Sequence, residues 1–187
     1  MDYAVNKRKK VMLILSICAG AIISFFLASF LHFAYKLTGG STFVAIFAAA
    51  NESVWEHVKI LLIPYLLWSI PEYYILKPDK KRFISARAAG ALTLMALTIC
   101  FFFVYSGIWG SSVLWIDISA ALLWLTAAQV TSMRVLCGQN RCEELFPIAA
   151  AVLCLIVVML LCFTVSPPKI GLFRDPVTLL YGLETMP

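Results

Sequence analysis

The sequence predicts an all-α membrane protein, a polytopic transmembrane helical bundle of about five spanning helices with one short interfacial or re-entrant segment. Of its 187 residues, 62% are hydrophobic and only 13% are charged, and the mean hydropathy is +0.91. A soluble domain carries about 45–50% apolar and about 25% charged residues, so this excess cannot be hidden in one small core. Several runs approach the roughly 20 apolar residues that a helix needs to cross a bilayer. The lipid bilayer is therefore the expected surrounding.

Five apolar runs define the predicted spans, and we take residues 1–187 as a single transmembrane domain. The spans are expected at residues 11–35, 58–76, 86–105, 113–133 and 146–165, followed by an outer tail over 166–187. The first run is longer than the 7–15-residue core of a typical signal peptide, so it is interpreted as a retained span. Residues 42–50 follow a helix-breaking TGGS and are too few to span alone. Pro64 and Pro71 lie inside the second span and are expected to kink it.

Basic residues gather in alternate predicted loops. Residues 7–10 (KRKK) form one block, the loop after the second span holds another, and Arg134 and Arg141 follow the fourth span. The positive-inside rule then places the N-terminus in the cytoplasm and, after five spans, the C-terminus outside a plasma membrane. No basic patch is interleaved with exposed aromatic residues, so nucleic acid is not an expected partner.

The heptapeptide NESVWEH, residues 51–57, is strongly polar for a chain of this composition. Ser53 and Glu56 match the S-x-x-E capping box, in which each side chain satisfies a free backbone N–H at a helix start. A carboxylate there also opposes the positive end of the helix dipole, and Lys59 can pair with Glu56. In this interpretation the motif is simply the beginning of the second span.

A helix cap does not account for the ionisable side chain of His57, and it accounts only partly for that of Glu52. Ionisable residues at membrane depth usually face a cavity or a partner, and other polar residues fall on the same predicted side of the membrane. They could converge on an outward-facing polar pocket, although Asp117 near a helix start equally fits a dipole interaction and His32 fits an interfacial histidine. Glu72 is expected to pair with nearby lysines. The candidate ligand-binding residues are Asn51, Glu52, His57, Asp117, Tyr35 and Asp175.

Several motifs occur in a characteristic order. They are HFAY at residues 32–35, NESVWEHVK at 51–59 leading to Pro64, DPVT at 175–178 and YG at 181–182. This order resembles the DUF6512 family of small bacterial membrane proteins of unknown function, and the block at 51–59 is its most specific part. The resemblance covers most of the chain. It implies a bacterial host and a plasma-membrane location, and it implies no particular activity.

Two functions of different classes fit these observations. The favoured one is non-enzymatic: a bundle that binds a small ligand or ion, or an accessory subunit, with homo-oligomerisation making up for its size. The alternative is a membrane-embedded, metal-assisted hydrolase or transferase acting on lipid at the outer leaflet. A divalent metal such as zinc would then be held by His32, Glu52, His57 and Asp117, with Glu56 as the catalytic general base. Because the sequence contains no His-Glu-x-x-His, His32 and His57 would have to meet in space.

Overall fold

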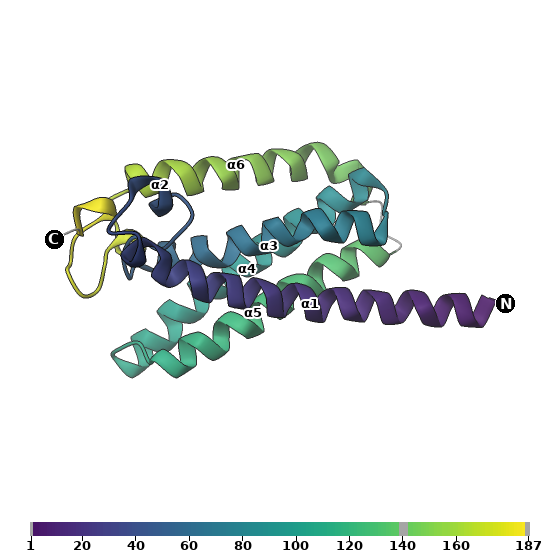
Figure 1. Ribbon diagram of the computed structural model, residues 1–187, viewed down its shortest axis with the longest axis horizontal. Coiled ribbons are helices and arrows are strands. Elements are labelled where there is room, and N and C mark those ends of the chain that lie inside the picture. Colours follow the sequence, from purple (N-terminus) through teal and green to yellow (C-terminus); the bar gives the residue numbers. More distant parts are fainter. Residues whose placement is uncertain (1, 139–141, 186–187) are drawn as a thin grey trace.

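The computed structural model describes residues 2–138 and 142–185, and within them five long helices run back and forth along one axis (Figure 1). These helices are α1 (Asp2–Leu37), α3 (Val54–Leu76), α4 (Lys80–Trp109), α5 (Leu114–Cys137) and α6 (Phe146–Val165). Four short helices accompany them: α2 (Thr42–Ala45), η1 (Cys142–Leu145), η2 (Gly171–Phe173) and η3 (Gly182–Thr185). The N-terminal residues and the tail lie at opposite ends of the bundle. We call the end that holds the α1–α3 connection and residues 166–185 the tail end, and the other end the basic end.

The predicted all-helical bundle is confirmed, and each predicted span falls on one long helix. The helices extend beyond the apolar runs because their ends are set by backbone hydrogen bonds and capping residues, which do not depend on apolar side chains. For example, α4 begins at Lys80, where the Asp79 carboxylate accepts from the Arg82 N–H at 2.9 Å as an N-cap. It ends where Gly110 takes a left-handed conformation with φ of 85°. In the described part of the chain, the β structure is limited to one isolated antiparallel bridge, between Arg174 and Tyr181.

Among the described residues, four helices are long and apolar enough to cross a membrane. The segments are Arg8–Leu37, Lys80–Trp109, Leu114–Cys137 and Cys142–Val165. The 23-residue helix α3 is not among them, although a span was expected there. Three charged residues, Glu56, Lys59 and Glu72, lie on α3 and are all buried. These three side chains face neighbouring elements, whereas Ile70 and Ile75 of the same helix are exposed.

Helix α3 packs against α1 and α4, and its side chains form the centre of the apolar core. Leu62 and Tyr65 are fully buried there, together with Leu94 of α4 and Leu125 of α5. The ring of Tyr65 lies against Gly90, where an added Cβ would come within 1.9 Å of the phenolic oxygen. Because only glycine fits at this point, α3 and α4 can approach closely.

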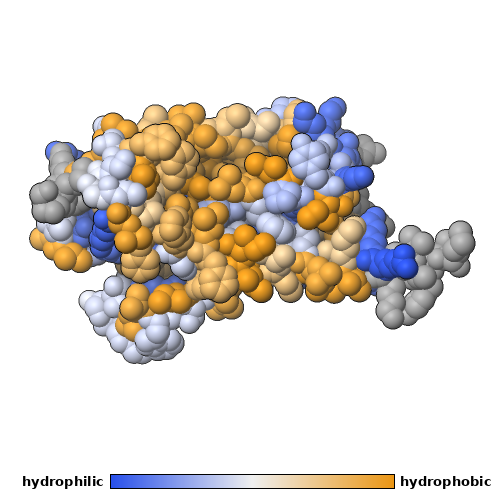
Figure 2. Space-filling model, viewed as in Figure 1, coloured by the Kyte–Doolittle hydropathy of each residue, from blue (hydrophilic) through white to orange (hydrophobic). Residues whose placement is uncertain are grey.

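The outward faces of the other helices are apolar, and hydrophobic side chains cover most of the visible surface (Figure 2). Phe26 of α1 is 68% exposed, Val104 of α4 61% and Leu123 of α5 60%. Patches of this extent on a soluble monomer would mark an interaction surface, whereas hydrocarbon solvates them without cost. The surface is therefore compatible with a multi-pass membrane protein.

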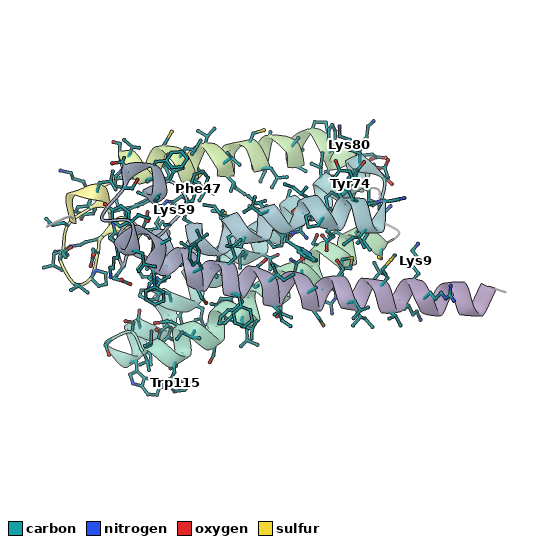
Figure 3. All side chains as sticks on the ribbon, in the orientation of Figure 1. Lys9, Phe47, Lys59, Tyr74, Lys80 and Trp115 are labelled. Atoms are coloured by element: carbon teal, nitrogen blue, oxygen red, sulfur yellow. The ribbon has the colours of Figure 1, made fainter. Side chains whose placement is uncertain are left out.

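Charged side chains gather mainly at the basic end. Lys9 and Lys80 lie there, far from Trp115 at the α4–α5 turn (Figure 3). The α3–α4 connection adds Lys77, and α5 ends near Arg134. Arg141, which belongs to the third predicted basic loop, lies outside the described residues. This distribution follows the predicted loop pattern.

The short segment after α1 forms one helical turn, α2, and then a loop that leads into α3. Ala45, Ala48 and Ala50 are buried and pack against Ala34 and Tyr35 at the end of α1. The segment thus folds against the tail end of the bundle instead of spanning it, as its length predicts.

Candidate metal-binding site

The loop that carries NESVWEH is held on three sides. The N–H of Ala49 donates to the Leu31 carbonyl of α1 at 3.2 Å. The N–H of Ala50 donates to the Glu56 carboxylate of α3 at 2.7 Å. From the tail, the carboxylate of Asp175 accepts from the Glu52 N–H at 3.4 Å. Residue 52 is therefore positioned by backbone contacts that leave its own side chain free to bind elsewhere.

Half of the predicted capping box forms. Ser53 is the N-cap of α3, and its hydroxyl accepts from the Glu56 N–H at 3.4 Å. The reciprocal bond is absent, because the Glu56 carboxylate binds the Ala50 N–H and the Ser53 N–H donates instead to the side-chain oxygen of Asn51 at 2.9 Å. The cap accounts for Ser53, and it leaves Glu52 and His57 for another role.

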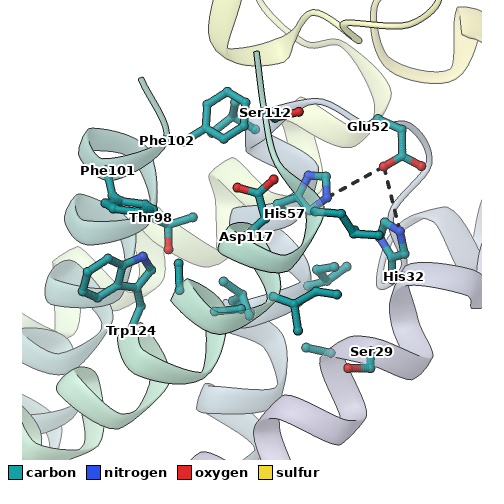
Figure 4. Close-up of a pocket in the computed structure, with 18 of the residues that line it drawn as sticks. Ser29, His32, Glu52, His57, Thr98, Phe101, Phe102, Ser112, Asp117 and Trp124 are labelled. Atoms are coloured by element: carbon teal, nitrogen blue, oxygen red, sulfur yellow. Dashed lines mark ion pairs between the residues drawn. The ribbon is translucent and has the colours of Figure 1, made fainter. Parts of the chain in front are cut away.

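His32, Glu52 and His57 come together at the tail end, each from a different segment. The Oε2 atom of Glu52 lies 3.9 Å from His32 Nε2 and 3.8 Å from His57 Nε2 (Figure 4). One potential ligand atom from each residue lies within 4.8 Å of the other two. All three side chains are partly exposed, at 26%, 34% and 39% for His32, Glu52 and His57. We call this cluster the triad.

A backbone contact selects the nitrogen that His57 offers to the triad. Its Nδ1 lies 2.9 Å from the Ser53 carbonyl, an oxygen that can only accept a hydrogen bond. Nδ1 therefore carries the proton in the neutral ring, and Nε2, which faces Glu52, keeps its lone pair. Metal-bound histidines commonly have this arrangement, in which a hydrogen bond at one nitrogen orients the other.

The second oxygen of Glu52 binds Lys36, at 3.3 Å from its Nζ. Lys36 lies on the last turn of α1 and its side chain is 69% exposed, so the pair contributes little stability. This contact nevertheless places a positive charge beside the triad.

The triad borders a cavity of about 640 Å³. Residues from α1, α3, α4, α5 and the tail line this cavity, and most of them are apolar. Its polar lining comprises His32, Glu52, His57, Asp117 from the first turn of α5, and the hydroxyl residues Ser29, Thr98 and Ser112. A metal ion held by three protein ligands would therefore have a coordination position open to this space.

Asp117 lies outside the triad in the described structure. Its carboxylate accepts a hydrogen bond from the hydroxyl of Tyr105, and that hydroxyl in turn accepts from the Val113 N–H at 3.1 Å. Three of the four predicted metal ligands thus converge, while the fourth faces the cavity from across it. Nothing in the spacing of Tyr105 and Asp117 marked their contact in advance, because an interhelical turn separates them.

Glu56, the predicted general base, is placed differently from the triad. It is buried, and its Oε2 lies 2.7 Å from the Nζ of Lys59, which is buried as well. Lys59 also donates to the Ala45 carbonyl at 2.7 Å and to the Thr164 hydroxyl at 3.1 Å, so it joins three segments inside the bundle (Figure 3). The predicted Glu56–Lys59 pair forms, and Glu56 is not among the residues that line the cavity.

Asn51, Asp175 and Tyr35, three of the predicted ligand-binding residues, are buried in the tail-end structure. The Asn51 side chain donates to the Gly182 carbonyl at 3.0 Å. Asp175 accepts from the Val177 N–H at 2.7 Å and from the Thr178 N–H at 3.2 Å, which closes a turn. These contacts assign Asn51 and Asp175 to holding the loop against the tail.

A second polar cluster, which we call the buried network, lies deeper in the bundle. Arg87 binds Glu72 at 2.7 Å, the Gln129 side-chain oxygen at 2.9 Å and the Ser69 hydroxyl at 2.8 Å. The Ser16 hydroxyl donates to the other oxygen of Glu72 at 2.7 Å. The expectation that Glu72 pairs with lysines is therefore wrong: Glu72 faces the helices, and Arg87 reaches it from α4.

The fold and the site together define a class: an all-helical bundle with four helices that could cross a membrane and a histidine–carboxylate cluster at one end. The chain matches the DUF6512 family, described as a family of unknown function, over residues 1–183, and it belongs to that family. No curated protein and no solved structure matches it.

Proposed function

We propose that this protein binds one divalent transition-metal ion, most simply Zn²⁺, through His32, Glu52 and His57. The observation that carries the proposal is the approach of three ligand atoms, from α1, the loop and α3, to within 4.8 Å of one another. Two histidines and one carboxylate are a ligand set that zinc uses where a further position stays open for water or another ligand.

The observed spacing is close to what coordination requires. With zinc–ligand bonds of about 2.0–2.2 Å and tetrahedral angles, ligand atoms lie roughly 3.4 Å apart. The Glu52–His32 and Glu52–His57 distances of 3.9 and 3.8 Å exceed this by a few tenths of an ångström. Partly exposed side chains can make that adjustment by rotation, without moving the helices.

A competing explanation needs no metal. If either imidazole is protonated, it forms an ion pair with Glu52, and Lys36 already adds a cation on the other carboxylate oxygen. With both imidazoles protonated, three cations would surround this one partly exposed carboxylate, which carries a single negative charge. The Ser53 carbonyl bond at His57 Nδ1 leaves one lone pair aimed at the cluster, which suits a metal better than a second proton.

Metal content of detergent-purified protein tests the proposal. Elemental mass spectrometry is expected to find about one metal ion per wild-type chain and little in His32→Ala, Glu52→Gln or His57→Ala. Two matched carboxylates serve as controls: Asp117→Asn in the same cavity and Glu143→Gln, which pairs with Arg82 far from it, should keep the metal. Metal-free wild type after exposure to Zn²⁺ would refute metal binding and leave the ion-pair explanation.

We further propose that the basic end faces the cytoplasm and the triad opens on the outer side of a plasma membrane. The positive-inside rule supports this orientation, because the basic blocks that hold Lys9 and Lys80 lie at the end opposite the triad, and the tail end carries fewer basic residues. Single cysteines at Lys36 and at Lys80, in a cysteine-free background, test it with a membrane-impermeant maleimide on intact cells. Labelling at position 36 alone is expected, and labelling at position 80 alone would reverse the orientation.

The second candidate function is metal-assisted hydrolysis or transfer on a lipid of the outer leaflet. The open coordination position beside a cavity favours it, because a metal-bound water there could act as a nucleophile. In this geometry Asp117, which lines the cavity, is better placed than Glu56 to accept its proton. Purified protein with Zn²⁺ should then hydrolyse a labelled phospholipid, and Asp117→Asn should slow the reaction by about 10²–10⁴-fold while keeping the metal. Accessory-subunit and oligomeric roles stay predictions.

A further inference from the structure

We propose that the cavity beside the triad holds a phospholipid of the surrounding bilayer, with its phosphate at the triad and one acyl chain between α1 and the α4–α5 hairpin. The position of the phosphate rests on the proposed metal. The position of the acyl chain rests on the cavity alone, so the two parts can be tested separately.

Ionisable and apolar side chains both line the cavity. His32, Glu52, His57 and Asp117 supply its ionisable groups. Its apolar walls include Phe25 of α1, Ile60 and Leu61 of α3, Phe101 of α4, and Ala121 and Trp124 of α5. A wholly polar ligand would leave these walls unmatched, and a wholly apolar one would desolvate the ionisable groups without partners. An amphipathic ligand satisfies both.

The rim of the cavity is apolar and exposed. Phe33 is 57% exposed, Leu114 74%, Ile118 49% and Val177 77%, and all four line the cavity. A hollow between the α4–α5 end and the rest of the molecule is visible from the side in Figure 2. The rim continues the lipid-facing surface of α1 and α5, so the ligand can enter from the hydrocarbon of the bilayer without crossing a polar barrier.

The size of the cavity and the charge of the site both favour one phospholipid, with a single acyl chain inside the cavity. A volume of about 640 Å³ lies within the roughly 300–1,000 Å³ of sites that hold one small ligand, which suits one chain and leaves the second in the bilayer. A divalent ion, Lys36, Glu52 and Asp117 together carry one net positive charge. The single negative charge of a phosphodiester complements it.

Ser29 offers a variant that fills the cavity with little risk to folding. It lines the cavity from α1, it is exposed, and its hydroxyl bonds only the Phe25 carbonyl of its own helix, at 2.9 Å. Thr126 of α5 is a matched control, because its hydroxyl likewise bonds its own helix, at Leu122, and it is not among the cavity-lining residues. We therefore compare Ser29→Phe with Thr126→Phe.

The experiment is native mass spectrometry of detergent-purified, zinc-loaded protein titrated with phosphatidylglycerol. Wild type and Thr126→Phe are expected to retain one lipid with equal affinity, and Ser29→Phe to bind it at least tenfold more weakly while keeping its metal. Removing the metal with a chelator should also weaken binding about tenfold. Equal lipid binding by Ser29→Phe and wild type would overturn the proposal.

Three other outcomes distinguish a lipid phosphate from free phosphate, and the lipid proposal from the metal proposal. Saturable lipid binding that chelation leaves unchanged would overturn the position of the phosphate. Displacement by inorganic phosphate, with no effect of Ser29→Phe, would assign the site to free phosphate and also overturn the lipid. A metal-free wild type whose lipid binding Ser29→Phe abolishes would refute the proposed function while supporting the acyl-chain position.

Discussion

The triad and the buried network both join a carboxylate to basic groups, yet they differ in how completely their bonds are formed. In the network, Glu72 and Arg87 are almost fully buried, and their shortest contacts are 2.7–2.9 Å. In the triad the corresponding contacts of Glu52 with the two histidines are 3.8–3.9 Å, and the groups are partly exposed. A cluster with satisfied bonds stabilises a fold, whereas a cluster with lone pairs to spare is suited to a ligand.

The network is not perfectly satisfied, and the exception is informative. The side-chain nitrogen of Gln129 and the indole nitrogen of Trp68 are buried without a partner among the described residues. Both approach Gly20 of α1, where an added Cβ would come within 2.5–2.6 Å of them. The helices here are packed too closely for a side chain, so the unpaired nitrogens result from tight packing and do not mark an open site.

Breaking the network should have the largest effect. Arg87→Ala leaves Glu72 buried without its charge partner, which costs about 3–5 kcal/mol in comparable buried pairs. Unfolding in mixed micelles with increasing sodium dodecyl sulfate measures the loss. The double variant Glu72→Leu/Arg87→Met serves as control and should recover much of it, because no isolated charge remains. If Arg87→Ala unfolds at the wild-type midpoint, the network has no structural role.

Zinc should stabilise the tail end by a smaller amount. At a free concentration of about 100 times the dissociation constant, a ligand that binds only the folded state adds about 2.7 kcal/mol. This increment is expected in wild type and in Arg82 or Glu143 variants, and absent in His57→Ala, as measured by the same unfolding titration. An increment that survives His57→Ala would place the metal elsewhere.

Acidification should reverse the stabilisation by zinc. Zinc binds neutral imidazole, so protons compete with the metal and the stabilisation should fall between about pH 7 and about pH 5. The ratio of bound metal to protein, measured after equilibrium dialysis at each pH, follows this loss. Metal occupancy that stays constant across this range would argue against histidine ligands.

Removing the cap should have an effect of about 1 kcal/mol. Ser53→Ala deletes the hydroxyl that accepts from Glu56 N–H and keeps the backbone carbonyl that orients His57. Unfolding should therefore shift slightly while metal content is unchanged. Asp79→Ala, at the N-cap of α4, is the matched control and should cost a similar amount. Loss of metal in Ser53→Ala would mean that the cap and the triad are one unit.

The smallest effect is expected at an exposed pair. Arg82 and Glu143 lie 3.1 Å apart, and the Glu143 side chain is 43% exposed. Glu143→Gln should change stability by about 0.5 kcal/mol or less, measured by the same unfolding titration. A loss as large as that of Arg87→Ala would show that exposure is not what separates the weak ion pairs from the strong one.

The sequence predicts the helices well because apolar runs of about 20 residues have few alternatives in a bilayer. It predicts that His32, Glu52 and His57 lie on the same side of the membrane, because the first predicted span ends there and the second begins there. It leaves open whether their side chains meet. It fails for Glu72 because one acidic residue near the end of a largely apolar run does not reveal which face of the helix meets protein. The Arg87 partner lies on the next helix, and only packing decides that the two meet.

The pairing of Asn51 with Gly182 has a consequence for how the site is made. These residues are separated by 131 positions in the chain, so the contact order of this loop is very high. During synthesis α1 and α3 can supply the loop's contacts with Leu31 and Glu56 before the tail exists, whereas the Asn51 contact cannot yet form. The contacts between the loop and the tail are therefore completed last, and a partly synthesised chain carries the histidines without this final support.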